Sequence, residues 1–393
     1  MGAVLPGIFV GAVFCFSLVS RRLSQTALTP PILFMVAGMA GLLLMGEVQT
    51  RPGQVDVFLH VAEAGLVLLL FTDASRTDLR VLRSIQALPM RLLGPGLLLT
   101  ILLGTLGALV VFPHLSVWEA GILGAILAPT DAGLGQVIVT SPRVPPSVRE
   151  ALNVEAGLND GLVVPFLMFF MAGDSARLAT LVVEQLGYGL MVGGGIGLAG
   201  GWLLGAAHRH GWMAESFEQL GVVALPACCL LVSPAVGASM FIAAFVAGLC
   251  VQVGFAGAGK HSVAFTEEWG QLLNLSVFFL FGALVVRAWP DLGTRFLWYA
   301  VLSLTVVRML PVAIALVGTR LNAATVLFMG WFGPRGLASI VLGLVYLEQE
   351  VRTPGEPIIR LAVVTTVLCS ILAHGLTARP GIAFYAAKSE VAA

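Results

Sequence analysis

APTDAGLGQV at residues 128–137 and VPPSVREALNVEAGLNDGLVVPF at residues 144–166 decide the fold of this chain. Both stretches lie in long apolar segments, yet they carry Asp131 and Asp160 at depths where a membrane has its hydrocarbon. If the chain reverses near Pro145, each aspartate lies about fourteen residues from the turn, or ~21 Å at the rise of an α-helix. A charged side chain costs at least ~2.5–3.5 kcal/mol at the bilayer centre, so we expect each to face a cavity or a partner. The spacing predicts that the two buried acids meet.

The composition is that of a polytopic membrane protein. Of 393 residues 58% are hydrophobic and 11% are charged, against roughly 25% charged in soluble domains. The formal net charge is zero and no basic stripe occurs, which excludes nucleic-acid binding. No loop is long enough for a soluble domain, so we expect residues 1–393 to form one integral membrane unit without a cofactor.

Thirteen apolar segments of spanning length follow one another along the chain, and they predict an all-α fold in a lipid bilayer. Thirteen of the 21 basic residues fall in the odd-numbered loops and the tail, against six in the even-numbered loops. By the positive-inside rule the N-terminus is outside and the C-terminus cytoplasmic. The expected spans are 4–20, 30–46, 56–75, 88–112, 118–140, 146–172, 178–207, 218–235, 238–254, 272–289, 296–318, 322–347 and 358–377.

Thirteen spans can be divided into six, one connector and six, which makes span 5 the counterpart of span 12. Both are interrupted, span 5 by Pro129 and Gly133, and span 12 by Gly330, Gly333, Pro334 and Gly336. Interrupted helices at matching positions indicate a transporter site built on inverted repeats. The halves have no clear residue-level similarity, so this prediction rests on helix counting. The glycines at 193–195 and 200–201 predict close helix packing.

Asp160 is the strongest candidate for the functional group. A carboxylate is a hard oxygen ligand that can hold a small cation or a proton, but not both, so one such group exchanges them one for one. The neighbouring Asn159 adds polarity without charge and leaves one titrating group, which favours electroneutral exchange. The alternative is a carboxylate held permanently by hydrogen bonds.

Thr130 and Asp131 follow Pro129, which removes a helical hydrogen bond. Two interpretations of this pattern remain open. The threonine hydroxyl, the aspartate and the freed carbonyls can ligate a cation together with Asp160, or Thr130 and Asp131 can cap the broken backbone.

Other intramembrane charges need partners. Arg335 and Glu155 are expected to form a buried ion pair whose role is structural, and Arg308 is left as the base without an evident partner. Asp73 relays ions from the cytoplasm, or it pairs with an arginine at the membrane surface, Arg76 or Arg80. His374 is placed, like the other histidines after residue 100, in a loop or near the end of a span.

The two opening stretches, together with GWFGPRGLAS at residues 330–339, resemble the signatures of NhaP-type sodium/proton antiporters. These form the electroneutral branch of the monovalent cation/proton antiporters. Weaker similarity extends through FTDASRTDLRVLR (71–83), FIAAFVAGLCV (241–251) and FFLFGALV (278–285), so the resemblance covers most of the chain.

The resemblance implies thirteen helices in two six-helix inverted repeats, whose broken helices cross at the ion site. It also implies a homodimer in which a mobile core domain carries the site across by an elevator-like movement. Asp160 would be the ion- and proton-binding carboxylate, with Asp73 near the cytoplasmic funnel. The remaining roles follow by position: Thr130, Asp131 and Asn159 at the crossing, and Glu155 with Arg335 as the buried ion pair.

Two residues depart from the pattern of that family. Ala156 stands where many relatives have a serine whose hydroxyl can ligate the cation, and Ala132 stands where a proline is usual. Both departures bear on ion affinity and on the choice between Na+, Li+ and K+.

The prediction for function is a secondary transporter of the cell inner membrane, active in pH homeostasis, that exchanges Na+ for H+ and is not an enzyme. The alternatives are K+/H+ antiport and an organic-ion transporter on a related fold. Outside transporters, Asp131 and Asp160 could serve as the pair of an intramembrane aspartyl enzyme.

Overall fold

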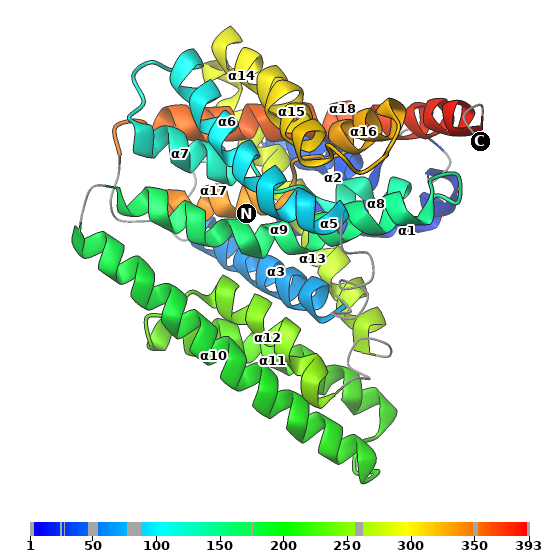
Figure 1. Ribbon diagram of the computed structural model, residues 1–393. Coiled ribbons are helices and arrows are strands. Elements are labelled where there is room, and N and C mark those ends of the chain that lie inside the picture. Colours follow the sequence, from blue (N-terminus) through cyan, green and yellow to red (C-terminus); the bar gives the residue numbers. More distant parts are fainter. Residues whose placement is uncertain are drawn as a thin grey trace. The chain divides into compact units, whose positions relative to one another are not determined.

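The computed structural model describes residues 4–23, 26, 28–45, 54–76, 88–173, 176–255, 262–348 and 353–390. All regular structure in these ranges is helical, which confirms the all-α prediction (Figure 1). The helices are α1 (Val4–Leu23), α2 (Pro30–Met45), α3 (Gln54–Arg76), α5 (Leu88–Arg91), η1 (Leu92–Gly96), α6 (Leu97–Val111), α7 (Val117–Ile126), α8 (Ala132–Val139), α9 (Pro146–Ala172), α10 (Ala176–Arg209), α11 (Glu215–Ala235), α12 (Met240–Gly254), α13 (Ser262–Ala288), η2 (Trp289–Asp291), α14 (Thr294–Leu304), α15 (Val306–Ala315), α16 (Ala323–Trp331), α17 (Leu337–Glu348) and α18 (Glu356–Glu390).

Each of the thirteen predicted spans coincides with a helix or with consecutive helices. Among the described residues, eight continuous helical segments, such as Leu88–Val111 with its consecutive helices, are long and apolar enough to cross a membrane. The protein is therefore a multi-pass membrane protein, while the number of thirteen spans stays a prediction. The last helix is longer than expected, because α18 continues past 377 to Glu390.

The chain forms two compact units whose segments alternate along the sequence. Unit 1 comprises Met1–Leu59, Ala87–Ala156 and Leu275–Ala393, and unit 2 comprises His60–Gln86 and Gly157–Asn274. The prediction of one transporter unit over 1–393 concerns how these parts work together, and it stays a prediction.

In unit 2, α10 runs beside α12 with their backbones in close contact (Figure 1). A Cβ atom on Gly193 or Gly197 would overlap a carbonyl oxygen of α12, and the same holds for Gly201 and Gly205. These four glycines recur every fourth residue and so share one face of α10. Gly194 and Gly195 have no neighbour within 4 Å, so only part of the predicted glycine cluster makes the contact.

In unit 1, α7 lies against α6, and a glycine again sets the distance between the helices. A Cβ atom on Gly124 would lie 2.7 Å from Thr105 Oγ1 and 2.8 Å from the Ile101 carbonyl oxygen. The Tyr299 hydroxyl of α14 also donates to the Gly104 carbonyl of α6 at 3.1 Å. This packing fixes the position at which α7 ends, where the candidate site begins.

Candidate functional site

The first interruption lies between α7 and α8 and contains Pro129, whereas Gly133, which was also expected to interrupt this span, lies in the first turn of α8. Helix α7 ends at Ile126, and α8 begins after Asp131, whose backbone is extended (φ −95°, ψ 116°). Asp131 caps α8, because its Oδ1 accepts a hydrogen bond from the Leu134 N–H at 3.1 Å. The prediction that span 5 is broken near Pro129 is confirmed.

The second interruption separates α16 from α17 and meets the first one. The Asp131 N–H donates to the Pro334 carbonyl at 2.8 Å, and the Leu337 N–H donates to Asp131 Oδ2 at 2.6 Å. One buried carboxylate therefore caps two helices, α8 and α17, whose N-termini both point at it. Gly336 makes this possible, because any Cβ atom there would overlap Asp131 Oδ2. Capping by Asp131 is thus observed, and ligation remains compatible because a carboxylate has further lone pairs.

Arg335 bonds the other end of the first break, which follows the C-terminus of α7. Its guanidinium is fully buried, and Nη1 donates to the carbonyl oxygens of Ala128 at 2.5 Å and Pro129 at 3.0 Å. These carbonyls follow the C-terminus of α7 and have no helical partner there. A cation at this end also complements the helix dipole.

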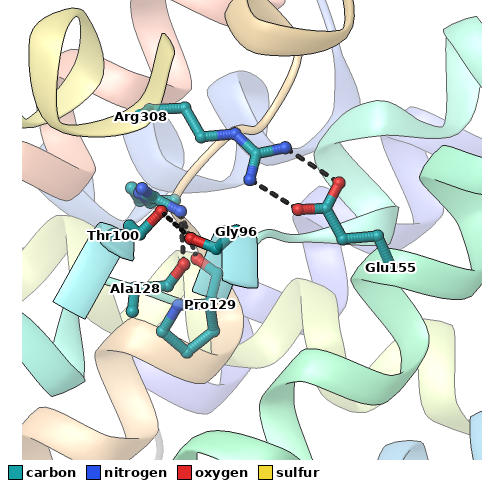
Figure 2. Close-up of polar contacts among 7 residues, drawn as sticks. Gly96, Thr100, Ala128, Pro129, Glu155 and Arg308 are labelled. Atoms are coloured by element: carbon teal, nitrogen blue, oxygen red, sulfur yellow. Dashed lines mark hydrogen bonds and ion pairs between the residues drawn. The ribbon is translucent and has the colours of Figure 1, made fainter. Parts of the chain in front are cut away.

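The prediction that Glu155 forms its ion pair with Arg335 is wrong. The structure pairs Glu155 with Arg308 of α15, with bonds of 2.5 Å from Nη1 and 2.8 Å from Nη2 (Figure 2). Both carboxylate oxygens of Glu155 are thereby bonded to the Arg308 guanidinium. The Arg335 guanidinium instead donates to the carbonyl oxygens of the first break. A buried arginine without an evident partner in the sequence was therefore the partner of the buried acid.

The other site residues are buried or half-buried. Thr130 lies buried in the first break, and Asn159 and Asp160 are buried on α9, one turn after Glu155. Asp73 of α3 lies against α9, since a Cβ atom on Gly157 would be 3.2 Å from Asp73 Cβ and 3.5 Å from its Cγ.

Gly157 and Asp160 are three residues apart on α9 and share a face of that helix. Unit 2 thus brings Asp73 to the face that carries Asp160. The side chain of Arg76, and Arg80, which were the surface partners considered for Asp73, lie outside the described residues. Thr130 and Asp131 belong to unit 1 and Asp160 to unit 2, so the meeting of the two acids stays a prediction.

A small cavity lies beside Asp131 within unit 1. Its volume of about 10 Å³ is at the lower limit for one water molecule. Only Thr130 and Asp131 among the lining residues have polar side chains, and Ala156 contributes no side-chain oxygen where a serine would carry one. The lining residues are Thr130, Asp131, Gly135, Ile138, Val139, Leu152, Ala156, Phe332 and Pro334. Across the described ranges, no group of three or more His, Cys, Asp and Glu side chains is arranged to hold a metal ion.

Comparison with known proteins places this arrangement in a family. Residues 9–383 match the sequence profile of the family described as "Sodium/hydrogen exchanger, transmembrane". The chain belongs to the sodium/hydrogen exchanger family. It is therefore a membrane transporter rather than an enzyme, and the aspartyl-enzyme alternative is excluded.

Individual members of the sodium/hydrogen exchanger family are distant in sequence. The K(+)/H(+) antiporter NhaP of Alkalimonas amylolytica is 28% identical over 350 residues, which cover 86% of this chain and 59% of that protein. The Na(+)/H(+) antiporter 2 of Zygosaccharomyces rouxii is 25% identical over 265 residues, covering 61% and 32% of the two chains. The chain thus spans less than two thirds of the length of these relatives.

Solved antiporter structures share the fold of this chain. The sodium proton antiporter MjNhaP1 from Methanocaldococcus jannaschii at pH 8 superposes with a TM-score of 0.72 at 20% identity, covering 94% of this chain and 98% of that one. This likeness concerns the fold alone.

The sequence analysis did not predict that three residues, Arg308, Ser370 and His374, lie at the candidate site. Arg308 was noted as a base without a partner, and His374 was expected near the end of a span. The structure buries His374 inside α18, where it contacts Ser370 and the end of α16. The four-residue spacing of Ser370 and His374 was the available signal, because it places them on one face of a helix.

Proposed function

We propose that this protein exchanges a monovalent cation, Na+ in the first place, for H+ across the membrane. The observation that carries the proposal is the pair of interrupted helices that meet on Asp131. Discontinuous helices place helix ends and free carbonyls at the substrate site of secondary transporters. Membership in the exchanger family supports the same reaction class.

In this proposal Asp160 holds the cation and the proton in turn. Each oxygen of Asp131 accepts a backbone N–H, so its carboxylate is engaged in holding α8 and α17, and Asp160 is the acid that exchanges. Thr130, Asp131 and Asn159 supply further oxygen atoms, and Asp73 leads ions toward Asp160 along α9. One acid that alternates between a cation and a proton carries equal charge in both directions, which makes the exchange electroneutral.

The wider setting belongs to the same proposal. We place the protein in the cell inner membrane with its N-terminus outside, because the basic residues gather on the opposite side. It works as a homodimer of two inverted repeats, and an elevator-like movement carries the site across. The breaks between α7 and α8 and between α16 and α17, at matching positions of the two halves, support the repeat.

Potassium is the second candidate cation. One relative that matches most of this chain is named a K(+)/H(+) antiporter, whereas others are named for Na(+). Ala156 supplies no oxygen to the cavity, which suits a cation that is less demanding in its ligands.

Transport in proteoliposomes tests the proposal. A pH gradient is imposed with the voltage clamped, Na+, Li+ or K+ is added in turn, and wild type is compared with Asp160→Asn. We expect one cation to dissipate the gradient in wild type at any voltage, and the variant to be inactive. Asp291→Asn, which removes an exposed carboxylate of η2, is the matched control and should transport normally. An active Asp160→Asn variant would overturn the site, and folded wild type without cation-coupled proton flux would overturn the reaction.

A further inference from the structure

Helix α18 carries a buried polar pair to which the proposed exchange assigns no role. Ser370 and His374 lie one turn apart in the interior of this long helix, and both are almost fully buried. Buried polar groups cost free energy unless they are hydrogen-bonded, so their partners show what they do. Those partners lie at both ends of the break between α16 and α17.

The pair holds the two ends of the break. The Arg335 N–H donates to Ser370 Oγ at 2.6 Å, and His374 Nε2 lies 2.9 Å from the Trp331 carbonyl oxygen. His374 Nδ1 lies 3.1 Å from Ser370 Oγ and 2.9 Å from the Ser370 carbonyl oxygen. The Trp331 carbonyl also accepts the Gly333 N–H at 2.9 Å, so its two lone pairs are both used.

The direction of these bonds follows from the donor inventory. A carbonyl oxygen only accepts, so His374 Nε2 must carry a proton to bond Trp331. In the neutral ring Nδ1 then accepts the Ser370 hydroxyl proton, while Ser370 Oγ accepts the Arg335 N–H. The result is a continuous chain from Arg335 through Ser370 and His374 to Trp331. A second proton on Nδ1 would donate to the Ser370 carbonyl and leave both contacts with the break in place.

The break that this chain spans is also the wall of the candidate site. Its Pro334 carbonyl accepts the Asp131 N–H, and the next helix begins with the Leu337 N–H on Asp131 Oδ2. Phe332 and Pro334 line the cavity beside Asp131. A shift of residues 331–335 therefore moves the oxygen atoms that a cation would meet.

We propose that Ser370 and His374 are positioning residues of the ion site. By bonding the backbone of residues 331–335, they keep this segment in place against Asp131. The proposal rests on the function proposed above. Neither side chain touches the cation, so their loss acts on the apparent affinity through Asp131 and the cavity wall. A merely structural role would lower only the amount or the stability of folded protein.

Four variants separate these roles. Ser370→Ala removes the acceptor for the Arg335 N–H, and His374→Leu removes the donor to Trp331. His374→Gln keeps an amide donor near the position of Nε2 and is the conservative rescue. Thr365→Val is the matched control, because it removes a buried hydroxyl of α18 that bonds the carbonyl of Leu361 in the same helix.

Two measurements on the full chain decide the proposal. Hydrogen exchange of the peptide over residues 331–337 should be faster in Ser370→Ala and His374→Leu, but unchanged in the control. In proteoliposomes the KM for the cation should rise about fivefold in these two variants, and His374→Gln should stay near wild type.

Each contrary outcome is distinct. Unchanged exchange of residues 331–337, or faster exchange with an unchanged KM, would overturn the positioning role. A fall in Vmax alone, matched by less folded protein, would also overturn it. If the wild-type protein did not exchange any cation for protons, the proposed function itself would be overturned, and this proposal with it.

Discussion

The contact between α10 and α12 and the crossing at Asp131 use the same residue type for opposite purposes. In α10 the glycines at 193, 197, 201 and 205 bring one helix backbone against another. At the crossing, a Cβ atom on Gly333 would overlap the Arg308 guanidinium, and one on Gly336 would overlap the Asp131 carboxylate. Glycine makes room for backbone in the first region and for charged side chains in the second.

The two regions differ because of where their hydrogen bonds are made. Helix α10 runs unbroken over 34 residues, so its backbone groups bond within the helix and only packing remains to be decided. The crossing has four helix ends, and their free N–H and C=O groups must be bonded by Asp131, Arg335, Ser370 and His374. Substitutions at the crossing should therefore act on stability and on transport, whereas those in α10 should act on packing alone.

Breaking the ion pair of Arg308 should give the largest effect. Arg308→Met leaves the Glu155 carboxylate buried without its partner, which typically costs about 3–5 kcal/mol. We expect poor yield and a strongly lowered Tm in detergent. Arg295→Met, at an exposed position of α14, is the control and should melt like wild type. If Glu155→Gln in the Arg308→Met background fails to recover part of the loss, the pairing assigned here is not the source of the effect.

A methyl group at Gly336 should be the next most harmful change. Gly336→Ala forces the backbone of the break away from Asp131 Oδ2, and overpacking of this kind costs about 1–3 kcal/mol. Because the same shift moves the cap of α17, the KM for the cation should rise together with a fall in Tm. Transport kinetics and thermal melting of one preparation check both. A lowered Tm with an unchanged KM would show that Asp131 follows the displaced backbone without loss.

Helix α10 offers a smaller effect with a sign that depends on the position. In Gly201→Ala the new Cβ atom would lie 2.5 Å from the Val251 carbonyl oxygen, so the Tm should fall while the KM stays unchanged. Gly195 has no neighbour within 4 Å, and Gly195→Ala should raise the stability by up to about 1 kcal/mol through helix propensity. Equal effects of the two substitutions on Tm would argue against the packing described for this face.

The sequence predicted the breaks well because their cause is local. Pro129 lacks an N–H, and Gly333, Pro334 and Gly336 cannot continue a helix without cost, so these residues mark the interruptions directly. That the interruptions belong to an ion site stays a prediction, which Asp131 beside the first of them suggested.

Side-chain pairing could not be predicted in the same way. Arg308 and Arg335 are both buried bases in apolar segments, and only the packing of α15 decides which of them reaches Glu155. The role of Ser370 and His374 also depends on tertiary structure, because their partners are backbone groups of another helix. A lone histidine in a sequence reads the same whether it lies in a loop or in a buried helix.

A substitution of Ala156 should give the smallest effect. It tests the role of the cavity separately from that of the helix breaks around it. Ala156 lines the space beside Thr130 and Asp131, so Ala156→Ser adds one oxygen without replacing a residue of either helix break. We expect the free energy of unfolding to stay within about 1 kcal/mol of wild type, since the substitution adds a single atom that can bond its own helix. The ratio of the KM values for Na+ and K+ should shift a few-fold toward Na+, because the smaller ion gains more from an additional hard ligand at short distance. Paired transport assays with the two cations in one preparation measure the ratio free of errors in protein amount. A changed Tm with an unchanged ratio would place the cation away from this cavity, and the search for its ligands would then turn to the face of α9 that carries Asp160.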